Sequence, residues 1–308
     1  MNPTLDIGLD VDRLVPNQKL RAESVRREPG GGGINVARGI HRLGGEVCAL
    51  FNGDERLGPR LASLLEDEGV PCRRLPVAGD LREGFSVRVN DTDELFHFVL
   101  PGPELAEEET RQALDAVLSF EPTPRYLVAS GGLPPGVDDD FYARLARGAA
   151  DKGIRLALDT HGKPLHAALE ESVYLIKPNI REFAELSGEQ ADDEQAIRKQ
   201  AREVVERYPI EVLIVTLGDK GALLTTSDTQ LRFQPPRTRT VSPVGAGDSF
   251  LAACIHRLAC DASMGEALRA GVAGAAAAVM TPGTSLFDPE EFQKILADTE
   301  ELPVPETE

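Results

Sequence analysis

Residues 244–250 read Val-Gly-Ala-Gly-Asp-Ser-Phe, a glycine-rich turn that opens onto a helical pattern. Glycines let successive backbone N–H groups converge at the start of a helix, where the helix dipole attracts an anion such as a phosphoryl group. The amides of Gly245, Ala246 and Gly247 therefore form a candidate anion hole. Asp248, in the first turn, is placed to accept a proton from an attacking hydroxyl. On its own, this motif fits a simple helix cap after a turn about equally well.

A second glycine run, Gly30–Gly33, leads straight into a helical pattern that ends near Leu43. Consecutive glycines suit a place where a ligand must touch the backbone, and Asn35 offers both a donor and an acceptor to sugar hydroxyls. The alternative is a flexible linker, but linkers do not usually run directly into an amphipathic helix. A dinucleotide site is disfavoured, because the spacing Gly-x-Gly-x-x-Gly after a strand is absent.

The segment Lys177–Phe183 follows the apolar run Tyr174–Ile176, at a strand end where open α/β sheets usually bind ligands. Asn179 and Glu182 fall on the opening turn of a helix, so they share a face and could hold Mg²⁺ through water. The same pair fits a capping box, with Asn179 as the N-cap and Glu182 as its partner. The capping box is slightly favoured for this segment taken alone.

Two more loops follow apolar runs. Thr216–Ala222 reads Thr-Leu-Gly-Asp-Lys-Gly-Ala, a turn that could receive a nucleotide but is also an ordinary hairpin entry. Ser130–Gly136 reads Ser-Gly-Gly-Leu-Pro-Pro-Gly, a rigid loop for which a purely structural turn is a strong alternative. Neither loop assigns a function by itself.

Short β-branched runs alternate with helical patterns from about Tyr126 onward, which predicts an α/β fold with a parallel sheet and helices on both faces. The expected strands are Tyr126–Ala129, Ile154–Leu158, Tyr174–Ile176 and Val212–Thr216. The expected helices cover Leu57–Glu68, Glu107–Ser119, Asp138–Lys152, Asp192–Tyr208, Ala246–Leu258 and Gly265–Met280.

The first hundred residues predict a small β-layer attached to one edge of the main sheet. Phe85–Val89 and Leu95–Leu100 flank a turn-rich tetrapeptide and read as a hairpin, while Lys19–Arg27 alternates like a strand. Met1–Asp6 has motif-like character but no strand precedes it, so the natural start is expected a few residues upstream. The acidic, proline-containing tail Asp298–Glu308 is expected to be disordered.

The 308 residues, 41% of them apolar, are enough for one large domain with its own core. A formal net charge of −18 argues against nucleic acid or an anionic membrane as a partner, since both need a basic surface. An anionic substrate would therefore need cations gathered around its site. The chain has no apolar stretch that could cross a bilayer and no signal pattern, so a cytoplasmic protein is expected. The four cysteines fit no common zinc motif and are expected to stay reduced.

Four motifs, taken in order along the chain, resemble the ribokinase-like (phosphofructokinase B) family of carbohydrate kinases: the glycine run, Ser-Gly-x-Leu-Pro-Pro-Gly, Lys-Pro-Asn-x-x-Glu and Gly-Ala-Gly-Asp. The likeness covers nearly the whole chain. It implies a single kinase domain over residues 1–308, built as a three-layer αβα sandwich with a mostly parallel central sheet. A small β-sheet lid is expected from roughly residues 9–28 and 72–100, and many family members form a homodimer through this lid.

The resemblance implies that ATP donates a phosphoryl group to an alcohol of a small phosphorylated sugar. The four-glycine run is most similar to that of members acting on fructose 6-phosphate, whereas members acting on fructose 1-phosphate more often carry Gly-Lys-Gly. Three departures from the family pattern leave the identity of the sugar undecided. Gly132 replaces a usual serine, Pro243 replaces a usual threonine, and residues 159–162 read Asp-Thr-His-Gly instead of Asp-Ser-Ser-Gly. A kinase for fructose 1-phosphate or tagatose 6-phosphate is thus an alternative. A sugar-phosphate-binding regulator without turnover is an alternative of another class, against which the intact Asp248 argues.

The resemblance also assigns roles by position, with Asp248 as the catalytic base and Gly245, Ala246 and Gly247 as the anion hole. The sugar hydroxyls would be held by Asp6, Gly31, Gly32 and Asn35, and the substrate's phosphate by Lys19 and Arg82. The nucleotide site would be lined by Lys177, Asn179, Thr216, Gly218 and Gly221. Glu182 would organise Mg²⁺ through water. A K⁺ site would be formed by Ser242, Val244, Ala278, Thr281, Gly283 and Ser285.

Overall fold

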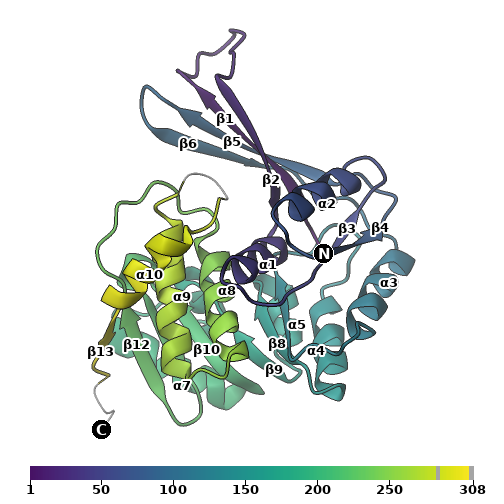
Figure 1. Cartoon of the computed structure of the whole chain (residues 1–308). Coiled ribbons are helices and arrows are strands. Elements are labelled where there is room, and N and C mark those ends of the chain that lie inside the picture. Colours follow the sequence, from purple (N-terminus) through teal and green to yellow (C-terminus); the bar gives the residue numbers. More distant parts are fainter. Residues whose placement is uncertain (282–284, 305–308) are drawn as a thin grey trace.

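A seven-stranded sheet runs through the centre of the protein, in the order β13-β12-β11-β10-β9-β8-β7 (Figure 1). The structure, a computed structural model, describes residues 1–281 and 285–304. The strands β7 to β10 pair in parallel, and the remaining pairings are antiparallel. The strand bounds are β7 Tyr126–Ser130, β8 Arg155–Asp159, β9 Val173–Ile176, β10 Ile210–Thr216, β11 Ala222–Thr225, β12 Gln230–Gln234 and β13 Glu300–Leu302.

Helices cover both faces of this sheet, because successive strand residues point to opposite sides and both sides are apolar. One face packs against α1 (Gly32–Arg42), α8 (Ala246–Ala259) and α9 (Met264–Ala278), with α10 (Pro289–Asp298) against α9. The other face packs against α4 (Phe141–Asp151), α5 (Gly162–Ala168), α6 (Ile180–Ser187) and α7 (Glu194–Arg207), and α3 (Glu107–Leu118) lies beside α4. The expected three-layer α/β architecture is confirmed.

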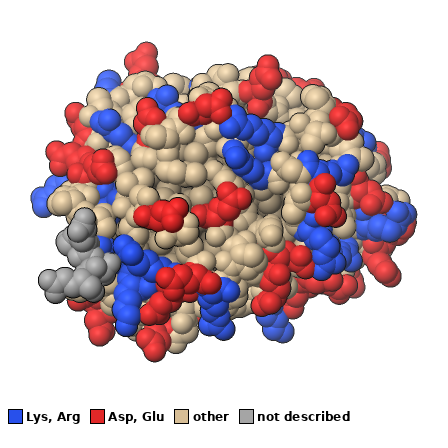
Figure 2. All heavy atoms as spheres, turned by 90° about the horizontal axis from the view of Figure 1, so that it is seen from below, with Lys and Arg blue, Asp and Glu red and all other residues tan. Residues whose placement is uncertain are grey.

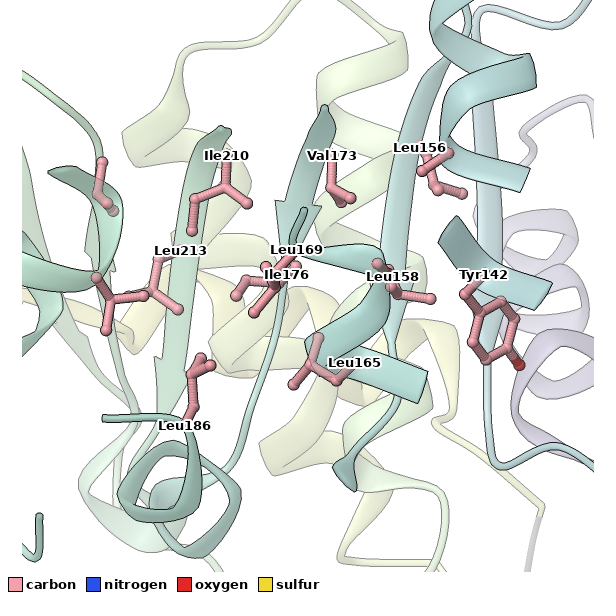
Figure 3. Close-up of a cluster of buried hydrophobic side chains, with 14 of the residues drawn as sticks. Tyr142, Leu156, Leu158, Leu165, Leu169, Val173, Ile176, Leu186, Ile210 and Leu213 are labelled. Atoms are coloured by element: carbon pink, nitrogen blue, oxygen red, sulfur yellow. The ribbon is translucent and has the colours of Figure 1, made fainter. Parts of the chain in front are cut away.

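The core under β8, β9 and β10 shows how these layers are joined. Figure 3 shows Leu158, Ile176 and Leu213, from three neighbouring strands, on the side of the sheet where Leu165 and Leu186 lie. Leu158, Ile176, Leu213 and Leu165 are at most 3% exposed. Burying such side chains stabilises a fold by about 1.5–3 kcal/mol each, so this core holds the strand ends in fixed positions.

A separate four-stranded sheet, in the order β2-β1-β5-β6, stands away from the main body (Figure 1). Its strands are β1 Thr4–Val11, β2 Ser24–Gly30, β5 Arg82–Val89 and β6 Glu94–Val99. We call this sheet the lid. The expected hairpin of β5 and β6 is present, and their register pairs Val89 with Glu94 next to the turn.

The bounds expected for the lid were wrong at two places. The first strand begins at Thr4 rather than near residue 9, because Thr4 already pairs with both Gly30 and Arg82. Residues 72–76 form β4 (Cys72–Pro76), which pairs with β3 (Ala49–Gly53) in a separate two-stranded sheet beside α2 (Gly58–Asp67).

Two further expectations need correction. The strand expected over Lys19–Arg27 is β2, Ser24–Gly30, since its partner β1 offers Asp10 to Ser24 and no residue to Lys19. The tail from Asp298 is not disordered throughout, because β13 pairs Leu302 with Arg232 of β12. Residues 305–308 of that tail lie outside the described residues.

The six helices expected from the sequence are all present, with ends shifted by at most three residues. Within residues 1–281 and 285–304, no helix is long and apolar enough to cross a membrane. Acidic and basic side chains are interspersed on the face drawn in Figure 2. The cysteines, Cys48, Cys72, Cys254 and Cys260, are all free thiols.

Candidate active site

The site lies where the carboxyl ends of β7, β8 and β9 meet the first turns of α1 and α8. The two helices pack side by side (Figure 1), with Gly39 against Ala252. Their N-terminal turns therefore reach the same edge of the sheet, which is where ligands of open α/β sheets bind.

Asp248 occupies the first turn of α8 and is partly buried. The Asn35 Nδ2 atom donates to Asp248 Oδ2 at 2.9 Å, and the Ser130 hydroxyl lies 3.5 Å from Oδ1. Burial raises the pKa of the Asp248 carboxyl to about 6, and the nearby Asp159 adds to the rise, while the Asn35 bond and Lys177 oppose it. A carboxylate with a pKa near the working pH is suited to accept a proton.

The backbone before Asp248 has the form expected of an anion hole. Gly245 adopts φ +77°, a left-handed conformation that favours glycine and turns the chain into α8. Within the described residues, the amides of Gly245 and Gly247 have no hydrogen-bond partner. The amide of Ala246 donates to Pro243 O at 3.4 Å, a long bond that a stronger acceptor could replace.

Gly32, at the start of α1, lets that helix approach the carboxylate closely. A Cβ atom on Gly32 would lie 2.1 Å from the Ser130 Oγ and 3.2 Å from Asp248 Oδ1. The neighbouring Gly33 would meet nothing within 4 Å. The glycine run therefore has one position where a side chain collides with the site and one where it meets open space.

Ser130 and Asp159 lie beside Asp248 and Lys177, although the sequence analysis gave neither residue a role. The Lys177 Nζ atom pairs with Asp159 Oδ1 at 3.1 Å, and the Ser130 hydroxyl lies 3.4 Å from Asp159 Oδ2. A Cβ on Gly247 would lie 3.3 Å from Lys177 Nζ, so the ammonium stands beside the anion hole. The signal that could have found both residues is their position, since each ends a parallel strand.

The residues expected at the nucleotide site follow β9 and β10, which are adjacent strands. Asn179 and Thr216 form a parallel bridge between the two strand ends. Gly218 (φ +65°) and Gly221 (φ +89°) shape the turn that follows, and a Cβ on Gly221 would lie 2.1 Å from Phe233 O. The hairpin alternative for this loop holds as well, because β10 and β11 are antiparallel neighbours.

Glu182 and Asn179 form the capping box that the spacing allowed. Asn179 Oδ1 accepts from the amides of Arg181 and Glu182, and Glu182 Oε2 accepts from the Asn179 amide at 2.8 Å. One carboxylate oxygen of Glu182 thus has a structural role. Because hard divalent cations use carboxylate oxygens and keep several waters, Oε1 fits an outer position in a Mg²⁺ site.

Of the residues expected to bind K⁺, Ser242 and Val244 lie in the turn that precedes α8, next to the end of α9. The backbone of Ser242 donates to Val279 O at 3.1 Å, and the Ser242 hydroxyl accepts from the Val244 amide at 3.2 Å. Two of the expected oxygens have other partners, since Ala278 O accepts from the Thr281 hydroxyl at 2.8 Å and Ser285 O accepts from Arg42. Gly283 lies outside the described residues.

The three residues expected to contact the sugar phosphate from the lid differ in burial: Asp6 is buried, Arg82 is half-buried and Lys19 is exposed. Asp6 lies between Gly30 and Gly84, at which added Cβ atoms would lie 2.0 Å and 2.6 Å from its carboxylate; burial raises the pKa of Asp6. Arg82 is half-buried and donates to Asn2 O at 2.9 Å and Pro3 O at 3.3 Å. Lys19 is exposed in the loop between β1 and β2 and has no contact with the site among the residues that the structure describes.

A scan of known protein families matches the model described as pfkB family carbohydrate kinase to residues 2–291. This chain belongs to the pfkB family. The expectation of an ATP-dependent carbohydrate kinase is thereby confirmed.

Named relatives of this pfkB kinase cover almost its whole length. It is 40% identical over 305 residues to the ATP-dependent 6-phosphofructokinase isozyme 2 of Mycobacterium tuberculosis, covering 98% of this chain and 90% of the relative. It is 39% identical over 296 residues to the protein of the same name from Escherichia coli, covering 96% of each. A 1-phosphofructokinase of Xanthomonas campestris is 33% identical over 267 residues, covering 85% of this chain and 84% of the relative.

Solved structures confirm the fold. Phosphofructokinase-2 from Escherichia coli matches with a TM-score of 0.91 and 38% identity over 96% of each chain, and its structures include a complex with potassium. Others contain fructose 6-phosphate or a tetrameric inhibited form. Arabidopsis thaliana ribokinase, at 20% identity, matches with a TM-score of 0.75 over 96% of each chain and so shows the ribokinase-like fold alone.

Proposed function

We propose that this kinase transfers the terminal phosphoryl group of ATP to the C1 hydroxyl of fructose 6-phosphate, giving fructose 1,6-bisphosphate and ADP. The hydroxyl oxygen attacks the γ-phosphorus, the bond from that phosphorus to the β,γ-bridging oxygen breaks, and the hydroxyl proton passes to Asp248. The proposal is supported by the two relatives named 6-phosphofructokinase isozyme 2, at 39% and 40% identity. The observation that carries it is the partly buried Asp248 carboxylate beside the amides of Gly245 and Gly247, which have no hydrogen-bond partner among residues 1–281 and 285–304.

Asp248 suits the role of base because its surroundings favour the protonated form of its own carboxyl group. The pKa of about 6 makes the carboxylate a better proton acceptor than an ordinary aspartate, yet leaves it mostly ionised at neutral pH. The Asn35 amide fixes Oδ2 of the carboxylate at 2.9 Å, and Oδ1 lies 3.5 Å from the Ser130 hydroxyl. Positioning of this kind lowers the entropic cost of reaching the transition state.

The negative charge of the moving phosphoryl group is stabilised by the first turn of α8 and by Lys177. The amides of Gly245 and Gly247, together with the helix dipole, act where charge develops. Lys177 is 5% exposed and pairs with Asp159, so its ammonium is held beside Gly247 without bulk water around it. Gly245, Ala246 and Gly247 are thus the proposed anion hole.

The sugar is proposed to bind between the lid and the start of α1. Asn35, Gly31 and Gly32 hold its hydroxyls from α1, and Asp6 holds them from β1. Arg82 and Lys19 are proposed to meet the phosphate. Arg82 already bonds main-chain carbonyls of Asn2 and Pro3, so it would have to exchange or share these partners when the phosphate arrives.

The nucleotide is proposed to lie along the ends of β9 and β10, where Lys177, Asn179, Thr216, Gly218 and Gly221 gather. Glu182 would hold Mg²⁺ through water, and the cation would supply charge neutralisation on the ATP phosphates. A K⁺ ion is proposed beside the anion hole, held by backbone and hydroxyl oxygens from Ser242, Val244, Ala278, Thr281, Gly283 and Ser285. The potassium complex of the Escherichia coli relative supports this assignment.

A homodimer through the lid is proposed because the lid exposes large apolar side chains. Phe98 is 52% exposed and Val99 63% exposed, both on the edge strand β6. Leu100, Phe96, Val25 and Leu20 add to this surface. Exposed apolar patches of this kind mark interaction sites in soluble proteins.

The test of the proposed substrate is a comparison of kcat/KM with ATP and Mg²⁺ across fructose 6-phosphate, fructose 1-phosphate, tagatose 6-phosphate and unphosphorylated fructose. We expect fructose 6-phosphate to be preferred by at least about tenfold, with the unphosphorylated sugar far below it, because the phosphate contributes binding energy. A preference for fructose 1-phosphate would replace this proposal by the alternative that the Xanthomonas relative represents. Binding of sugar phosphate without any turnover would favour the regulator.

A further inference from the structure

Arg38, on the second turn of α1, is a buried arginine with a fixed orientation. Its side chain is 1% exposed. The guanidinium donates from Nε to Glu68 Oε2 at 2.8 Å and from Nη2 to Glu68 Oε1 at 2.6 Å. Two parallel bonds of this kind hold the guanidinium and the carboxylate in one relative orientation. Although burial acts to raise the pKa of Glu68, its bonds to Arg38 lower it overall, so the partner stays a carboxylate.

The third guanidinium nitrogen of Arg38 faces two oxygens near the active site. Nη1 donates to Pro29 O at 2.9 Å and to Asn35 Oδ1 at 3.3 Å. Asn35 lies three residues before Arg38 on α1, so the two side chains share one face of the helix. A guanidinium has donors and no acceptor. The side of the Asn35 amide that faces Arg38 must therefore be its oxygen.

The other side of the Asn35 amide meets Asp248. Asn35 Nδ2 donates to Asp248 Oδ2 at 2.9 Å. An ionised carboxylate has acceptors and no donor, so the side of the amide that faces it must be the nitrogen. The reversed amide would place its oxygen against the carboxylate and its NH₂ group against the guanidinium. A continuous chain of hydrogen bonds results, through Glu68, Arg38, Asn35 and Asp248.

This chain of hydrogen bonds lies largely inside the protein. Asn35 is 4% exposed and Arg38 is 1% exposed. A buried amide that loses a partner cannot recover it easily from water, so it turns toward whatever partner remains. The orientation of the Asn35 amide therefore depends on the residue that faces its oxygen.

We propose that Arg38 is a positioning residue, which holds the Asn35 amide with its nitrogen toward the Asp248 carboxylate. The importance of this for catalysis rests on the proposed function, in which Asp248 is the base. Without Arg38 the amide can turn over, and its oxygen then faces Asp248. That arrangement disfavours the ionised carboxylate, which is the form that accepts a proton.

The Asp248 carboxyl is also faced by groups from three other elements: Ser130 at the end of β7, Asp159 at the end of β8, and Lys177 after β9. Burial is the main cause that raises the pKa of Asp248, and the Asn35 bond is the main cause that opposes the rise. Asp159 adds to it, while Lys177 and Ser130 oppose it. None of these three residues is changed in the variants below, so the pKa of Asp248 reports on the Asn35 amide.

The test measures the pKa of Asp248 in Arg38→Met by NMR of isotope-labelled aspartate carboxyl carbons. We expect the pKa to rise by about one unit, because the carboxylate loses its hydrogen-bond donor. This readout needs no substrate and does not depend on the proposed function.

Arg232 gives a matched control for the loss of a buried arginine. Its side chain is 2% exposed, and it donates from Nε to Glu194 Oε1 at 3.0 Å and from Nη1 to Phe233 O at 2.6 Å. It lies on β12, which β11 and β10 separate from β9. Arg232→Met should lower the melting temperature as Arg38→Met does, yet change the pKa of Asp248 by less than about 0.2 units.

A double-mutant cycle separates the amide from the charge of Arg38. In an Asn35→Ala background, Arg38→Met should move the pKa of Asp248 by less than about 0.3 units, because no amide remains to turn. The same shift with and without Asn35 would show that Arg38 acts by its charge alone, and it would overturn the proposal.

A paired replacement covers the case in which Arg38→Met does not fold. Arg38→Met with Glu68→Met removes both charges, which usually costs less stability than leaving one partner alone. The same rise in the pKa of Asp248 is expected. An unchanged pKa in either variant would overturn the proposal.

Kinetics connects the proposal to turnover. The acidic limb of the pH profile of kcat/KM reports the base of the free enzyme, so it should move upward with the pKa of Asp248 in Arg38→Met. A shifted pKa with an unshifted profile would support the positioning by Arg38 and count against Asp248 as the base. Failure of the proposed function and failure of this inference are therefore distinguishable.

Discussion

At the scale of single residues, the burial of Asp248 has a consequence for stability. Its carboxyl has a pKa of about 6 in the folded protein against an ordinary 3.8, so folding favours the protonated form. The stabilising contribution of this proton is present below about pH 4 and is lost as the pH rises through about 6. At pH 8 the folded protein holds the Asp248 charge in a partly buried position, which costs stability.

We therefore expect Asp248→Asn to raise the free energy of unfolding at pH 8 by about 2–3 kcal/mol, because each unit of pKa shift corresponds to about 1.4 kcal/mol. Urea unfolding at pH 8 and at pH 4 measures this difference. The gain should vanish at the lower pH. The exposed Asp228→Asn serves as a control and should change stability by less than about 0.5 kcal/mol at either pH. A variant destabilised at pH 8 would show that the Asp248 charge is compensated by its neighbours.

The two adjacent glycines at the start of α1 allow a matched comparison. In Gly32→Ala the new methyl group collides with the Ser130 hydroxyl, at 2.1 Å, and crowds Asp248. We expect kcat to fall at least about tenfold, since small displacements of a base reduce turnover strongly. Gly33→Ala places its methyl group in open space and should retain a melting temperature at or above that of the parent protein. Equal activity of the two variants would contradict the close approach of Gly32 to the base.

The sequence predicted part of the site at this scale. Asp248 and Asn35 were both selected because each follows a glycine-rich stretch at the start of a helix. In the structure their side chains are hydrogen-bonded to each other. Ser130 and Asp159 lie in stretches that the sequence singled out, residues 130–136 and 159–162, but neither residue was given a role because each is an ordinary polar residue at a strand end. Their relation to Asp248 comes from the alignment of parallel strands, which pairs Ser130 with Asp159 although they are far apart in sequence.

At the scale of elements, two helices begin with the same capping box but differ in position. α6 begins with Asn179 and Glu182 at the site, and α9 begins with Ser263 and Glu266 at an exposed turn. In each, the glutamate accepts from the backbone amide of its cap residue at 2.8 Å. The amide oxygen of a glutamine can keep this bond, so Glu→Gln removes the charge while the cap remains.

We expect Glu182→Gln to raise the Mg²⁺ concentration for half-maximal activity by about tenfold, with little change in melting temperature, because the carboxylate charge no longer attracts the cation. Glu266→Gln should leave the Mg²⁺ requirement unchanged. Initial rates over a Mg²⁺ titration at fixed ATP measure both. If the two variants behave alike, Glu182 is a capping residue only.

Helices were predicted more closely than strands, for a physical reason. The pattern of α3 is local, and its expected start at Glu107 agrees with the structure. β1 carries apolar Leu5, Ile7, Leu9 and Val11 at alternate positions, a strand pattern that the prediction overlooked, and its partner β5 lies about 80 residues further along the chain. β13 likewise forms only because Arg232 and its neighbours offer it an edge. Pairings of this kind depend on the assembled fold rather than on a short window of sequence.

At the scale of the whole molecule, the lid surface predicts the oligomeric state. Phe98→Lys places a charge at the centre of the exposed apolar side chains of β6, and we expect it to convert a dimer into a 33.2 kDa monomer. Light scattering after size-exclusion chromatography measures the mass. Ile180→Lys, at an exposed apolar residue outside the lid, should keep the dimer. A parent protein that is monomeric at micromolar concentration would contradict the assignment of this surface.

The fold brings together the lid and the proposed anion hole, which lie far apart in the sequence. The lid comes from the first hundred residues, while the anion hole comes from α8 near residue 246. α1 connects them, because it follows β2 of the lid directly and its Asn35 contacts Asp248. A sugar bound between the lid and α1 would thus lie beside Asp248, the proposed base.

The most direct test of this account is the turnover of Asp248→Asn with ATP, Mg²⁺ and fructose 6-phosphate at pH 8, alongside its ATP dissociation constant. We predict that kcat falls by about a hundredfold or more while ATP affinity stays within about twofold of the parent, since the variant keeps the side-chain shape and loses only the proton acceptor. Turnover close to that of the parent protein would contradict the central claim that Asp248 is the base.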